Sequence, residues 1–97
     1  MTDMKTMSLG RELTVAQVAE LYIKSLQLLS EDGGLEIEMS DLQVVDAAGV
    51  QFLLALSLTA QESGLQLRMS SPSPALIETV DVLGLRSELA QIIHVDN

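Results

Sequence analysis

The chain has 97 residues, of which 47% are apolar, so it is long enough for one packed domain and is not a disordered segment. Its formal net charge of −9 disfavours nucleic acid and anionic membrane surfaces as partners, because both recruit clustered lysine and arginine. The lack of cysteine excludes disulfides, thiolate chemistry and cysteine-based zinc sites. We expect a single domain over residues 1–97.

The chain does not open with a basic segment followed by an apolar one, which is the pattern of a secretory signal. The densest apolar run, Val50–Leu58, is too short to cross a bilayer. We therefore expect a cytoplasmic protein without direct membrane insertion.

The first segment, up to Leu9, is weakly patterned and predicts part of a strand, followed by a bend at Gly10. Thr14 then begins a helix, since Gln17 three residues later completes a capping box. Gly33-Gly34 ends this helix. Apolar residues at helical spacing predict its buried stripe: Val15, Val18, Ala19, Tyr22, Leu26 and Leu29.

The segment Leu35–Met39 alternates apolar and charged residues, which predicts a strand with Glu36 and Glu38 on its less buried face. After a further extended stretch, Leu42–Val45, Asp46 caps a helix that we predict from Ala47 to Ser63. This helix is apolar on more than one side. It is therefore either enclosed in the core or keeps part of its surface for a partner.

A third alternating segment, Leu65–Met69, predicts another strand. Ser73 as N-cap and Pro74 at the first helical position predict the start of the next helix, which ends at Gly84. The segment Leu85–Ile93 predicts a short helix, or a helix that runs into a last strand reaching Val95.

Strands that alternate with helices favour parallel neighbours and crossover connections. The predicted fold class is therefore α/β, with a mostly parallel four-stranded sheet flanked by about four helices.

Candidate chemistry is sparse. His94 is the only histidine, no nucleophile lies in a matching motif, and the carboxylates are scattered, so we predict no enzyme, no metal site and no cofactor. Asp46 is best explained as a helix cap. A phosphoacceptor aspartate of the response-regulator kind is rejected, because the chain is too short and has no lysine after Lys24. A phosphate-binding turn would need a glycine-rich loop with lysine and a hydroxyl residue.

The extended stretch Leu42–Val45, followed by Asp46-Ala47-Ala48-Gly49 and an apolar helix, resembles the signature of STAS domains, the anti-sigma-factor antagonist family. The later segments Gly64–Leu67, Pro74–Leu76 and Leu83–Leu85 also resemble that family. The resemblance covers about residues 9–93. It adds a STAS-like arrangement to the fold predicted from the pattern.

The resemblance implies a cytoplasmic adaptor of bacterial signal transduction or transcription regulation. Its partner would be a protein: an anti-sigma factor of the serine-kinase kind, or a transporter or signalling subunit. The alternative is an accessory STAS subunit of a larger complex, such as a lipid-transport ABC system or a chemotaxis-associated assembly. The oligomeric state is left open.

The predicted partner-binding residues lie at the start of the apolar helix and in the loop before the next one: Asp46, Ala47, Ala48, Gly49, Gln51, Ser71 and Ser73. Two alternatives stay open among them. The small residues of the turn serve either a partner's approach or helix–sheet packing, and Ser73 is also a helix cap.

The sequence departs from the family in two ways. Switching members carry serine or threonine between the aspartate and the glycine, whereas Ala47 and Ala48 have no hydroxyl to accept a phosphoryl group. Many members also begin with an additional edge strand. Since little chain precedes Leu9, we expect this first strand to be short or absent.

Overall fold

The computed structural model describes residues 4–31 and 33–94, except for the side chains of residues 93 and 94. The elements follow one another as β1 (Lys5–Ser8), β2 (Glu12–Leu13), α1 (Val15–Leu29), β3 (Leu35–Glu38), β4 (Val44–Val45), α2 (Ala47–Glu62), β5 (Leu67–Ser70), α3 (Pro74–Val82), α4 (Arg86–Ala90) and β6 (Ile93–His94). This alternation confirms the predicted α/β class.

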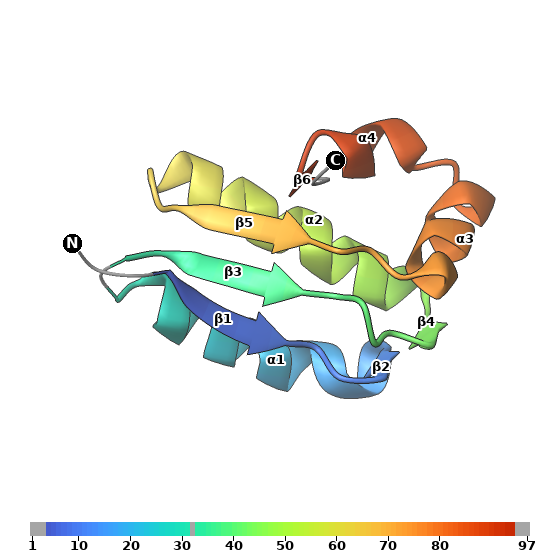
Figure 1. Cartoon of the computed structure of the whole chain (residues 1–97), viewed down its shortest axis with the longest axis horizontal. Helices are drawn as coiled ribbons and strands as arrows, with labels where there is room; N and C mark the ends of the chain where they lie inside the picture. The colour runs from blue at the N-terminus through green and yellow to red at the C-terminus, as the bar shows by residue number, and fades with distance from the viewer. Residues whose placement is uncertain (1–3, 32, 95–97) are drawn as a thin grey trace.

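The described strands form two parallel sheets (Figure 1). The larger has four strands in the order β1-β3-β5-β6, and the smaller pairs β2 with β4. The predicted four-stranded parallel sheet is thus confirmed. The first strand is short but present, since Lys5 pairs with Leu35 and Ser8 with Glu38.

The helices α1 and α2 lie side by side on one face of the larger sheet, behind it in Figure 1. Helix α3 packs against β4, and α4 packs against α3 and β6. The core between these layers is aliphatic apart from Phe52. Its fully buried side chains include Leu13, Leu29, Leu35, Ile37, Leu53, Leu56, Met69, Leu76 and Val80.

Strand β3 has the burial pattern that its sequence predicts. Leu35 and Ile37 are fully buried beneath the helices, while Glu36 and Glu38 are half-buried on the opposite face. Arg68, on the neighbouring strand, forms an ion pair with Glu36 at 3.3 Å.

The predicted buried stripe of α1 is partly wrong. Val15 is 71% exposed and Ala19 is also exposed, whereas Ser25 and Leu29 are buried. The helix packs on the sheet through the line of Ser25 and Leu29, so its Val15–Ala19 line faces outward beside α2. Ser25 can be buried because its hydroxyl donates to the carbonyl oxygen of Leu21 at 2.7 Å.

Helix α1 ends at Leu29 with Ser30 as its C-cap, and so stops before the predicted end at Gly33-Gly34. The remaining element boundaries differ from prediction by one or two residues. Strand β5 begins at Leu67 and ends at Ser70, and α2 ends at Glu62 with Ser63 as its C-cap. The last segment is a helix that leads into a strand, β6, as one of the two predictions had it. Val95, which that prediction included, lies outside the described residues.

Candidate functional site

Asp46 holds the starts of two helices together. Its Oδ1 accepts a hydrogen bond from the backbone amide of Gly49 at 2.9 Å, which caps α2 as predicted. Its Oδ2 accepts from the backbone amide of Val15 at 3.0 Å, in the first turn of α1. This second contact was not predicted from the sequence. It arises because β2 pairs with β4, which sets Leu13 opposite Val45 and so brings the two helix starts side by side.

These two hydrogen bonds also set the ionisation of Asp46. The bond from the Gly49 amide, followed by the bond from the Val15 amide, stabilises the carboxylate and lowers the pKa of Asp46 below its ordinary value of 3.8. The group is therefore ionised at neutral pH, and its negative charge faces the positive ends of two helix dipoles.

The first turn of α2 exposes small side chains. Ala47 and Gln51 are exposed, and Asp46 and Ala48 are half-buried. We call these four residues the turn surface.

Gly49, in the same turn, is buried against β2. A Cβ atom at this position would collide with the carbonyl oxygen of Leu13 and come within 2.9 Å of its Cγ. Of the two roles left open for the small residues, Gly49 therefore serves packing: it lets α2 approach the backbone of β2. A partner has no access to it, so the turn surface does not include it.

The two serines predicted with this site have different surroundings. Ser73 is buried, and its hydroxyl accepts a hydrogen bond from the amide of Leu76 at 3.1 Å, so it acts as the cap of α3. Ser71 is exposed and has a positive φ of 56°. Hydrogen bonds from Ser40 are the main cause that lowers the pKa of Glu38, and the side chain of Ser71 lowers it further. A partner contact at Ser71 stays a prediction.

An apolar groove between α1 and α2 adjoins the turn surface, and the sequence analysis did not anticipate it. Within it, Tyr22 and Phe52 meet edge to face with ring centroids 6.3 Å apart. The signal in the sequence was the line of small and apolar residues that had been assigned to the core. This α1–α2 groove is lined by Val18, Ala19, Tyr22, Ala48, Gln51, Phe52 and Ala55.

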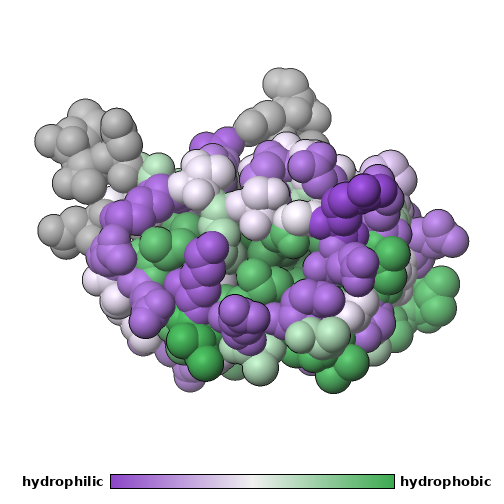
Figure 2. Space-filling model, turned by 90° about the horizontal axis from the view of Figure 1, so that it is seen from below, coloured by the Kyte–Doolittle hydropathy of each residue, from purple (hydrophilic) through white to green (hydrophobic). Residues whose placement is uncertain are grey.

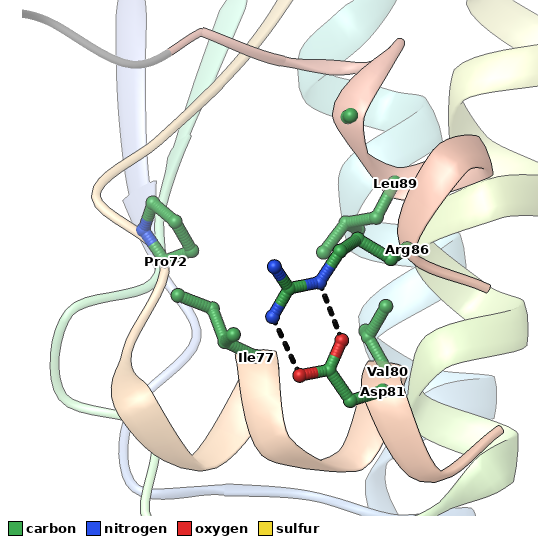
Figure 3. A pocket seen from close by; sticks show the side chains of 7 residues that line it. Pro72, Ile77, Val80, Asp81, Arg86 and Leu89 are labelled. Atoms are coloured by element: carbon green, nitrogen blue, oxygen red, sulfur yellow. Dashed lines mark hydrogen bonds and ion pairs between the residues drawn. The ribbon is translucent and has the colours of Figure 1, made fainter. Parts of the chain in front are cut away.

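A second hollow, of about 320 Å³, lies between α3 and α4 (Figure 3). At its side the guanidinium of Arg86 donates to both carboxylate oxygens of Asp81, at 2.5 and 2.6 Å. This contact lowers the pKa of Asp81 and raises that of Arg86. Because each charge already has its counterpart, we assign the pair to joining α3 and α4.

Within residues 4–31 and 33–94, no three metal-ligating side chains converge. None of the helices in that part of the chain is both long enough and apolar enough to cross a bilayer. The side chain of His94, the lone histidine, lies outside the described part.

Comparison with known proteins agrees with the fold described above. The family model described as "Mlab, STAS domain" matches residues 2–93. A solved structure, that of a sulfate transporter family protein from Wolinella succinogenes, has the same fold, with a TM-score of 0.71 and 18% sequence identity over 97% of this chain and 77% of that one. No curated protein matches the chain. The earlier resemblance is thereby confirmed, and the chain belongs to the STAS-domain family, in the group described as Mlab.

Proposed function

We propose that this chain is a non-enzymatic, cytoplasmic adaptor that binds a protein partner through the turn surface. One observation carries the proposal: around the first turn of α2 the accessible side chains are the small ones of Ala47 and Ala48, with Gln51 and the capping Asp46 beside them. A partner's backbone can approach such a turn closely, because little side-chain volume stands in the way.

Binding at this surface would not be switched by phosphorylation of the turn. The side chains of Ala47 and Ala48 end in methyl groups, which cannot form a phosphoester. The interaction is therefore constitutive, or is regulated through the partner. The partner classes that the family resemblance implies are an anti-sigma factor of the serine-kinase kind and a transporter or signalling subunit.

A second candidate function is that of an accessory subunit held permanently in a larger complex, such as a lipid-transport ABC system. Two observations favour it. The matching family model carries the description Mlab, and several large apolar side chains of α1 and α2 are exposed, Ile23 at 62% and Leu58 at 56% among them. Permanent interfaces are more apolar than transient ones.

The first proposal is tested by comparing two pairs of variants in affinity capture with tagged full-length chain. Gln51→Arg alters the turn surface, and Gln61→Arg makes the same change at an exposed position near the other end of α2. Ala47→Asp is compared in the same way with Ala90→Asp on α4. An aspartate at position 47 suits a helix start, so the fold should persist.

We expect the two turn variants, Gln51→Arg and Ala47→Asp, to lose the partner and the two control variants to retain it. An unchanged set of captured proteins for both turn variants would rule out this surface.

Purifying the chain alone separates the two candidates. An adaptor should be a stable monomer in sedimentation, with a cooperative unfolding transition. A permanent subunit should aggregate or require co-expression with its complex. A stable monomer therefore contradicts the second candidate.

A further inference from the structure

The α1–α2 groove is an apolar hollow that continues the turn surface along the two helices, since Ala48 and Gln51 belong to both. It is shallow and open to solvent, with a volume of about 370 Å³. Two exposed apolar side chains lie one turn further along the helices: Ile23, four residues after Ala19, and Leu58, three residues after Ala55. Seen from the side of α1 and β1, apolar side chains reach the surface between polar ones (Figure 2).

The lining of the groove suits apolar side chains better than a small polar ligand. The hydroxyl of Tyr22 is already hydrogen-bonded to Thr59 at 3.0 Å, which leaves the amide of Gln51 as the polar side-chain group of the lining. Sites for small molecules usually offer several convergent polar groups to fix the ligand's orientation. The groove therefore matches an apolar stripe on a polypeptide.

Its shape matches a helix. Both sides of the groove carry small side chains: Ala19 on α1, and Ala48 and Ala55 on α2. Helix axes can approach closely where the side chains in contact are small. From Ala48 to Ala55 the groove follows α2 for about 10 Å, or two helical turns. An amphipathic helix can place side chains at positions i, i+4 and i+7 along such a length.

The charges around the groove favour a basic helix. Glu62 lies seven residues after Ala55, on the same side of α2, and is exposed. On α1, Glu20 and Lys24 are turned about 100° and 140° from Ala19, away from Val18 and Tyr22 of the lining, so neither charge faces the groove. The net charge of −9 also attracts a cationic partner and opposes a second copy of this chain.

We infer that the α1–α2 groove receives an amphipathic helix of the protein partner, with lysine or arginine flanking its apolar stripe. The inference rests on the proposed adaptor function and specifies which part of the partner is bound. The apolar stripe lies between Ala19 and Ala55, and a basic flank faces Glu62.

The experiment places the photo-crosslinker p-benzoylphenylalanine at Ala55 in the groove, at Ala47 on the turn surface, or at Ala90 on α4 as a control. Each full-length protein is irradiated with cell extract, and the crosslinked peptides are identified by mass spectrometry. The segment found at position 55 is then synthesised, and its binding to the chain is measured by fluorescence anisotropy. Ala55→Arg and Ala90→Arg, with folding checked by circular dichroism, provide the matched comparison.

We expect the crosslink at position 55 to fall on a partner segment with apolar residues at i, i+4 and i+7 and basic flanks. Ala55→Arg should raise the Kd of that peptide at least about tenfold, as truncation or blocking of an interface centre does, and Ala90→Arg should leave it unchanged. A crosslink to an acidic segment, to an extended loop or to a second copy would overturn the inference. If position 47 crosslinks to a partner and position 55 does not, the inference fails while the adaptor proposal stands; if neither does, both fail.

Discussion

Gly49 and Asp46 fix the position of α2 by two different means. Gly49 permits contact between the helix and the backbone of Leu13, and Asp46 ties the helix start to that of α1 by hydrogen bonds. The two residues belong to the family signature, yet their contacts here lie within the chain. The exposed members of the turn, Ala47 and Gln51, are the ones free to contact a partner.

Replacing Gly49 by alanine tests the packing role, because the role predicts the sign of the change in the free energy of unfolding. Helix propensity alone would make alanine more stable than glycine by about 0.8–1.0 kcal/mol. The collision of the new Cβ with the Leu13 carbonyl should reverse this and cost about 1–3 kcal/mol instead. Urea unfolding gives the free-energy difference, with Ser57→Ala in the middle of α2 as a control. A Gly49→Ala variant more stable than the natural chain would contradict the packing role.

Asp46 should make stability depend on pH in the acid range. Because its folded pKa lies below the ordinary 3.8, the carboxylate stabilises the fold above about pH 4, and this contribution is lost as the pH falls through the folded pKa. We expect Asp46→Asn to be less stable at pH 7 and to lose less stability on acidification. Glu38 and Asp81 also have lowered pKa values, so the relevant quantity is the difference between natural chain and variant in urea unfolding at each pH. Parallel pH profiles would contradict the assignment.

The residue types predicted the local contacts of this site but not the distant ones. The cap of α2 by Asp46 and the cap of α3 by Ser73 follow from the sequence, because a cap involves residues within one turn. The bond from Asp46 to Val15 and the contact of Gly49 with Leu13 join segments more than thirty residues apart. They depend on the pairing of β2 with β4. Each of these strands has two residues, which is too short to be predicted from a sequence pattern.

Among the elements, α1 shows what periodicity can and cannot predict. The apolar spacing and the capping box at Thr14 predicted its existence and its start correctly. They did not predict which side faces the sheet. Val15, Ala19 and Tyr22 are as apolar as a core stripe, yet Val15 is exposed and Ala19 and Tyr22 line the α1–α2 groove. The buried side of α1 also contains a polar residue, Ser25, so it was not recognised as the side that faces the core.

The connection between α3 and α4 should depend on packing more than on charge. Leu89 is buried, whereas the Asp81–Arg86 pair is exposed and screened by solvent. We expect Leu89→Ala to cost about 2–3 kcal/mol, and Arg86→Gln to leave the unfolding midpoint nearly unchanged. Thermal unfolding of the two variants side by side measures this. A larger loss for Arg86→Gln would show that the ion pair is the main connection.

At the scale of the whole molecule, the sheet order and the charge are the defining properties. The parallel order β1-β3-β5-β6 could be predicted as a class from the alternation of elements. The separate pairing of β2 with β4 could not, since both segments are too short for a periodic signal.

The net charge of −9 predicts how partner binding responds to salt. If the partner presents a basic helix, its affinity should fall as the salt concentration rises from about 50 mM to about 500 mM, because screening shortens the range of the attraction. The association rate should account for most of the change, and surface plasmon resonance separates it from dissociation. An affinity that is independent of salt would indicate a partner held by apolar contacts alone.

The single carboxylate that joins two helix starts has a consequence for motion. A ligand that pulls on the beginning of α2 also pulls on the beginning of α1, so the two should tilt as one body over the sheet. In native-state hydrogen exchange, the amides of Val15 and Gly49 should therefore become protected or exposed together, and in Asp46→Ala their exchange should become independent. An adaptor built in this way would pass a displacement of one helix start to the other without any chemical modification.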